Sequence, residues 1–118
     1  MQKVGMNLLP ESYRLFMRKP HGNSNENEND HHLYEIWDSK EEEVYKYGIS
    51  DDPIDEDGLS RRIRSQLALF NNLVNWVRFV GRVLIKNISG RKKARELERE
   101  HIEAHKEEFG EKPRGNRS

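Results

Sequence analysis

The chain has no cysteine among its 118 residues, which excludes disulfide bonds and thiolate metal sites. It also has no apolar stretch of the roughly 18 residues that a membrane-spanning helix needs, and residues 1–20 do not show a signal-peptide pattern. An excess of charge of either sign is missing too, since 21 basic side chains balance 21 acidic ones. Only the local distribution of charge can therefore point to a partner. We expect a soluble protein that acts in the cytoplasm, with no membrane partner.

Apolar residues are scarce, at 33% of the sequence, whereas charged residues reach 36%. This composition is polar for a compact domain but still within the range of sequences that fold. The length corresponds to one domain, and a dense apolar run at residues 67–88 can supply its centre. We expect a small core and marginal stability.

The first 32 residues are predicted to be an arm and a linker ahead of the domain. Residues 1–20 contain a few apolar side chains that would suit a short docked helix. Residues 21–32, HGNSNENENDHH, are rich in asparagine and show no periodicity. Such a segment buries too little apolar area to offset the entropy of ordering, so we interpret it as an exposed linker. The predicted domain spans residues 33–118.

Within that domain, hydrophobic spacing predicts an α+β fold with the order β-β-α-β-α. Alternation predicts two strands joined as a hairpin, and apolar residues at 59, 63, 67, 70 and 74 have helical spacing. The predicted elements are strands at 33–38 and 43–49, a helix over 59–74, a strand at 77–88 and a helix at 91–109. We expect a small three-stranded antiparallel sheet flanked by the helices, with an irregular N-terminal arm.

The stretch YKYGIS at 45–50 ends the second predicted strand. Strict alternation would place Tyr45 and Tyr47 on one face and Val44 and Lys46 on the other. Gly48 interrupts these strand-forming residues, which suggests a close approach of the backbone to another group.

Five short stretches follow one another in an order typical of a known family. They are Leu33-Tyr34, Lys46-Tyr47-Gly48-Ile49-Ser50, Leu59-Ser60-Arg61-Arg62-Ile63, ARELEREHI at 94–102, and Pro113-Arg114-Gly115-Asn116. Together they resemble the GIY-YIG nuclease domain over residues 33–116. Two positions depart from its pattern, because His32 stands at the GIY glycine and Lys46 at the first tyrosine of YIG.

The resemblance implies a metal-dependent endonuclease that hydrolyses phosphodiester bonds, with one Mg²⁺ or Mn²⁺ ion per site and DNA rather than RNA as substrate. It implies that Tyr34 activates the attacking water with the help of Lys46. Arg62 would stabilise the phosphoryl charge, and Glu98 would hold the metal. The supporting residues would be Tyr47, Gly48, His101 and Asn116.

Helical geometry selects two of these residues independently. Arg62 lies about 80° from the centre of the apolar stripe of its helix, whereas Arg61 lies about 180° away. Glu98 has Ala94 and Ile102 as its i±4 neighbours and therefore follows the apolar face of the last helix. An inward carboxylate is costly without a partner, and a divalent cation would be one. The alternative is one more glutamate paired with a basic neighbour.

Basic side chains concentrate in the second half of the chain, which is compatible with phosphate binding. The candidates for nucleic-acid contact are Arg61, Arg64, Lys92 and Lys93. The alternative is an ordinary surface of mixed charge. The two histidines of HIEAH at 101–105 do not form the HExxH arrangement, so we expect no zinc site.

Other functions remain open at this level. The chain could be a non-catalytic nucleic-acid-binding module on the same fold, or a protein-interaction domain that uses its charged last helix. Domains that resemble GIY-YIG nucleases also occur as the toxic tips of bacterial polymorphic toxins, delivered as part of a secreted effector. That role implies a cognate immunity protein, which could use the charged surface of 41–57 or the last helix. The competing role is a free-standing repair, restriction or mobile-element nuclease.

Overall fold

The structure, a computed structural model, describes residues 26–117, so the short helix suggested within residues 1–20 lies outside the described part. The element order confirms the predicted β-β-α-β-α arrangement and adds a short 3₁₀ turn at the end. The elements are β1 (Asp30–Asp38), β2 (Glu43–Ser50), α4 (Arg61–Val74), β3 (Phe79–Ser89), α5 (Arg91–Phe109) and η1 (Arg114–Asn116). No helix in the described range is long and apolar enough to cross a membrane.

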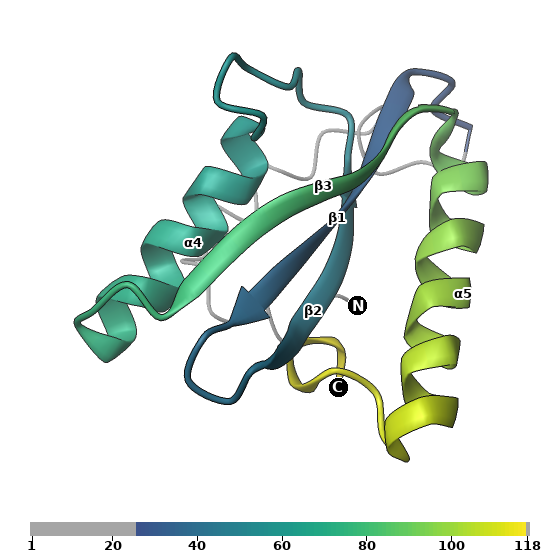
Figure 1. Ribbon diagram of the computed structural model, residues 1–118. Coiled ribbons are helices and arrows are strands. Elements are labelled where there is room, and N and C mark those ends of the chain that lie inside the picture. The colour runs from purple at the N-terminus through teal and green to yellow at the C-terminus, as the bar shows by residue number, and fades with distance from the viewer. Residues whose placement is uncertain (1–25, 118) are drawn as a thin grey trace.

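The three strands form an antiparallel sheet in the order β2-β1-β3, so β1 is the central strand. Helices α4 and α5 lie on opposite sides of this sheet (Figure 1). On the α4 side, Tyr34 and Ile36 of β1 pack with Ile63 and Phe70 of the helix. On the α5 side, Leu33 joins a second core cluster that includes Ala94 of that helix. Alternate residues of the central strand thus serve two small cores.

Helix α4 begins two residues after the predicted start at residue 59 and ends at residue 74, as predicted. Ser60 caps it, and its side-chain oxygen accepts a hydrogen bond from the backbone N–H of Ile63. Asn75 ends the helix in the left-handed conformation, with φ of 63°. The buried positions are three and four residues apart, at Ile63, Gln66 and Phe70. One face of the helix therefore faces the sheet.

The predicted alternation along β2 is wrong at Tyr45. The pairing of β1 with β2 shifts by one residue, because Ile36 pairs with Lys46 whereas Trp37 pairs with Val44. Tyr45 is the extra residue of this β-bulge. Its ring packs against Phe70 and Phe79 on the α4 side, whereas the ring of Tyr47 packs against His101 on the α5 side. The two tyrosines therefore lie on opposite faces.

The prediction of an exposed linker over residues 21–32 is wrong for part of its described end. β1 begins at Asp30, three residues earlier than expected, and His31 and His32 are buried within it. Asn27 is buried as well, and its backbone carbonyl accepts a hydrogen bond from the N–H of Arg91. Pairing with β3 supplies the backbone hydrogen bonds of this polar segment, so it does not need a strand-forming composition.

Asp38, the last residue of β1, is the buried centre of an ion cluster. Its carboxylate accepts two hydrogen bonds of 2.8 Å from Arg78, and Arg114 donates a further one. The backbone N–H groups of Lys40 and Glu41 also donate to it. Together these bonds lower the pKa of Asp38 well below its usual range, although burial opposes them. The cluster joins the hairpin, the start of β3 and the C-terminal turn.

Candidate functional site

Tyr34 lies in the middle of β1 and is buried on the α4 side, with 1% of its surface exposed. Its hydroxyl donates a 2.8 Å hydrogen bond to Oε1 of Gln66 on α4. Gly48 pairs with Tyr34 across the hairpin, and a Cβ at that glycine would lie only 2.4 Å from the tyrosine oxygen. The glycine is therefore required because any side chain would displace the Tyr34 ring.

Lys46 is two residues from Gly48 on the same strand and is also 1% exposed. The 3₁₀ turn covers it, since a Cβ on Gly115 would lie 2.7 Å from Cβ of Lys46. Burial and, to a smaller extent, the positive charge of Arg62 lower the pKa of Lys46 to about 7, while the negative charge of Glu98 opposes this shift. The ammonium group thus lies within electrostatic reach of both residues.

Arg62 and Glu98 approach this buried lysine from the two helices. Arg62 is half-buried on α4, whereas Arg61 beside it is exposed, which agrees with the predicted stripe geometry. Glu98 is half-buried on α5, one turn after the fully buried Ala94. Burial raises the pKa of Glu98, and the charge of Lys46 opposes this shift. The carboxylate is partly desolvated, and Lys46 is the cation that stabilises its ionised form most strongly.

Asn116 stabilises the exposed edge of the sheet beside Lys46. Its Oδ1 accepts a 2.8 Å hydrogen bond from the N–H of Tyr47, and its Nδ2 donates a 2.9 Å bond to the carbonyl of Tyr47. The side-chain amide thus takes the place of a neighbouring strand on the edge strand β2. The C-terminal turn, the edge strand and the buried lysine are in this way held as one unit.

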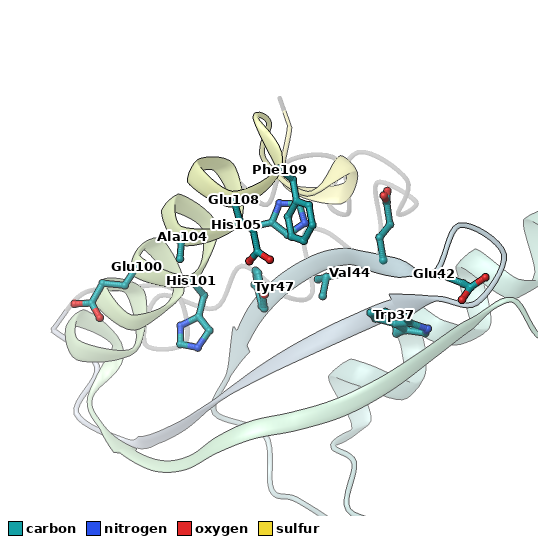
Figure 2. A pocket seen from close by; sticks show the side chains of 11 residues that line it. Trp37, Glu42, Val44, Tyr47, Glu100, His101, Ala104, His105, Glu108 and Phe109 are labelled. Carbon is teal, nitrogen blue, oxygen red and sulfur yellow. The ribbon is translucent and has the colours of Figure 1, made fainter.

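His101 and the ring of Tyr47 lie outside the proposed catalytic cluster, which consists of Tyr34, Lys46, Arg62 and Glu98. Their rings contact each other, with centroids 5.4 Å apart, on the α5 side of the sheet. Nδ1 of His101 donates a 2.9 Å hydrogen bond to the carbonyl of Leu97. Both rings line a groove that contains none of Tyr34, Lys46, Arg62 or Glu98 (Figure 2). The backbone of Tyr47 supports the cluster, while its ring faces another surface.

The four basic residues predicted to contact nucleic acid are all exposed, but they differ in their surroundings. Arg64 forms salt bridges with Asp55 and Asp57 of the acidic loop before α4. Its charge is therefore compensated within the chain. Lys92 and Lys93 lie in the first turn of α5, the helix that carries Glu98.

Two buried polar residues beside Tyr34 were missed by sequence reasoning. Gln66 is 1% exposed, and within residues 26–117 its Nε2 has no hydrogen-bond partner. His32 is 2% exposed, and its Nε2 lies 3.0 Å from Oγ of Ser60. Gln66 could have been found, because it lies three residues after Ile63 on the predicted apolar stripe. The sequence around His32 did not indicate burial, because this histidine ends the polar stretch at 21–32.

The described residues offer a single carboxylate at this cluster. Within residues 26–117, no group of three or more histidine, aspartate or glutamate side chains is arranged to hold a metal ion. Mg²⁺ typically takes one or two carboxylates and fills its other positions with water and phosphate oxygens. The partly desolvated Glu98 fits that kind of ion and does not fit a zinc site built from protein ligands alone.

Comparison with models of known families finds a match that covers most of the chain. The model of a family described as URI fold toxin 2 matches residues 24–110. No curated protein and no solved structure matches the chain. The matched region covers both strands of the hairpin, both helices and β3, and it ends before the C-terminal turn.

Proposed function

This chain belongs to the URI fold toxin 2 family, and we propose that it is a toxin that hydrolyses phosphodiester bonds of DNA as a GIY-YIG-like endonuclease. The observation that carries the proposal is the buried Lys46, 1% exposed, whose pKa responds to the charges of both Arg62 and Glu98. A buried lysine coupled to a half-buried guanidinium and a partly desolvated carboxylate is costly to assemble in a domain of this size. Phosphoryl-transfer chemistry uses such a set of charges.

Tyr34 is the proposed acceptor of the proton from the attacking water. In the described state its hydroxyl donates to Oε1 of Gln66, so it is protonated and oriented. The positive charge of Lys46 and Arg62 would favour its phenolate form. The Nε2 of Gln66, which has no partner among the described residues, would donate to that phenolate after rotation of the amide. Gln66 is therefore proposed as the positioning residue of the base.

Arg62 is proposed to stabilise the charge that develops on the phosphoryl oxygens. A guanidinium matches the geometry of two phosphate oxygens and stays protonated at all relevant pH values. Arg62 is half-buried on α4, so its guanidinium group lies where electrostatic interactions are stronger than in bulk water. Glu98 would hold one Mg²⁺ or Mn²⁺ ion. Such an ion supplies further charge stabilisation for the phosphoryl group.

The proposed toxicity is tested by expressing residues 1–118 in a bacterium that carries no inhibitor of this protein. We expect growth arrest and degraded chromosomal DNA with the wild-type chain, and normal growth with Glu98→Gln at the same protein level. Normal growth with soluble wild-type protein would contradict the toxin assignment. Growth arrest with intact DNA would support the toxin assignment and contradict the assignment as a DNA nuclease.

The adjacent arginines give a matched pair that separates catalysis from binding. We expect Arg62→Ala to reduce the cleavage rate by roughly 10²-fold or more, because it removes charge from the transition state. We expect Arg61→Ala mainly to weaken DNA binding and to reduce its dependence on salt, because the exposed side chain is placed to contact phosphate. Single-turnover rates and binding measured over a range of salt concentrations distinguish the two. Equal defects in both variants would show that the arginines form only a phosphate-contacting patch.

A further inference from the structure

A groove separate from the proposed catalytic cluster opens between the C-terminal half of α5 and the β1–β2 hairpin. Its volume is about 330 Å³. Figure 2 shows His101, His105 and Phe109 pointing from the helix toward the sheet, where Tyr47 and Val44 form the other wall. The rings follow one another closely, with centroids of His105 and Phe109 4.6 Å apart and those of His105 and Tyr47 6.5 Å apart.

The apolar side chains of this groove remain accessible. Phe109 is 63% exposed and Trp37, at the hairpin end of the groove, is 36% exposed. A small domain has little apolar surface to bury, and exposed aromatic rings do not contribute to its stability. Such rings gain from being covered by a partner. Aromatic residues at the centre of a concave surface are typical of protein interfaces.

Within residues 26–117, the charged residues that line the groove are all glutamates, and no lysine or arginine lines it. They form its rim and are Glu42, Glu43, Glu100 and Glu108. Arg114 pairs with Glu43, whereas Glu42, Glu100 and Glu108 are exposed to solvent. This rim repels the phosphates of a nucleic acid and attracts lysine and arginine side chains.

We propose that the groove binds a basic segment of the inhibitor protein of this toxin, with an apolar side chain of that segment between Tyr47 and Phe109. Charge complementarity selects a polypeptide with lysine or arginine flanking an apolar anchor. The inference rests on the toxin part of the proposed function and does not depend on the nuclease part. It places the inhibitor on α5 and β2, the two elements that carry Glu98 and Lys46, and outside the catalytic cluster.

The test is an NMR titration of the full chain carrying Glu98→Gln, with the synthetic peptide RKWLKR as the probe. We expect saturable shifts at Trp37, Tyr47, His101 and His105 that weaken as salt is raised. A control peptide with glutamate in place of each arginine and lysine should produce none. The absence of saturable shifts, or shifts confined to the acidic loop at 51–57, would overturn the proposal.

A pair of double variants isolates the rim. Glu100→Lys combined with Glu108→Lys should weaken binding of the peptide by about tenfold or more. Glu103→Lys combined with Glu107→Lys makes the same charge change at exposed positions of α5 that do not line the groove, and it should have little effect. Equal losses would mean that only the overall charge matters, and would reject the groove.

The same variants keep the two proposals apart. In the chain that retains Glu98, the Glu100 and Glu108 double variant should cleave DNA at the wild-type rate, because neither residue belongs to the cluster. If the wild-type chain cleaves no DNA but the peptide still binds the groove, the nuclease assignment fails and the docking surface stands. If cleavage is normal and the peptide does not bind, the docking surface alone is rejected.

Discussion

We expect Glu98→Gln to stop the cleavage of DNA while the chain stays folded, which would be the largest effect of a single substitution on activity. The substitution keeps the shape of the side chain and removes the one carboxylate that the described cluster offers to a metal ion. We expect a loss of roughly 10³-fold or more in the single-turnover rate, comparable with the loss of a principal electrostatic element in other enzymes.

Folding should survive this change because the native state does not favour the ionised form of Glu98. Burial raises the pKa of the carboxyl, so a neutral amide of the same size removes a desolvation cost. Lys46 loses its counter-charge in return, which limits any gain. Glu96→Gln is the matched control, since Glu96 is exposed on the same helix. Wild-type turnover by the Glu98 variant, or equal losses in both variants, would contradict the role of Glu98.

Asp38→Ala should produce the largest loss of stability. The carboxylate is fully buried and bonded to Arg78 and Arg114, so its removal leaves two guanidinium groups without their buried partner. Breaking a buried ion pair in this way typically costs about 3–5 kcal/mol, a large part of the total stability of a small domain. Urea unfolding followed by tryptophan fluorescence measures the loss.

The matched control for that variant is Asp55→Ala. Asp55 also pairs with an arginine, Arg64, but both side chains are more than 40% exposed, and such pairs contribute about 0–1 kcal/mol. If Asp38→Ala lowers the free energy of unfolding no more than Asp55→Ala does, the structural role of the ion cluster around Asp38 is contradicted.

The pH dependence of stability should change as well. The folded state lowers the pKa of Asp38 below its unfolded value of 3.8. Its contribution is therefore fully present above about pH 4 and is lost as the pH falls through the folded pKa. As the pH falls from about 4 toward the folded-state pKa of Asp38, the free energy of unfolding should decrease faster for the wild-type chain than for Asp38→Ala. Parallel curves for the two proteins would show that Asp38 is not held ionised.

The order of the elements was predictable because each element carries its own local signal. The stripe at Ile63, Leu67 and Phe70 defines α4, and glycines bracket the last helix at Gly90 and Gly110. The faces of β2 were not predictable, because the bulge at Tyr45 arises from pairing with β1 and leaves no mark in the local pattern. The one extra residue places Tyr45 and Tyr47 on opposite faces, whereas strict alternation would place both on one face.

The candidate site was predictable only where a residue carries a charge at a helix face or belongs to a recognised stretch. Arg62 and Glu98 met both conditions. Gln66 lies on the predicted apolar stripe, but it is uncharged and outside the recognised stretches. The burial of His32 depends on contacts between segments far apart in the sequence. The groove is missing from the sequence for the same reason, since it exists only where α5 passes over the hairpin.

Whether this toxin is a metal-dependent nuclease, as we propose, is decided by incubating the purified full chain with supercoiled plasmid DNA and Mg²⁺. We predict nicked and then linear plasmid from the wild-type chain, no cleavage in excess EDTA, and recovery when Mg²⁺ or Mn²⁺ is restored. Plasmid that stays supercoiled with either metal, in the presence of folded wild-type protein that binds DNA, would contradict the claim and identify a non-catalytic nucleic-acid-binding module.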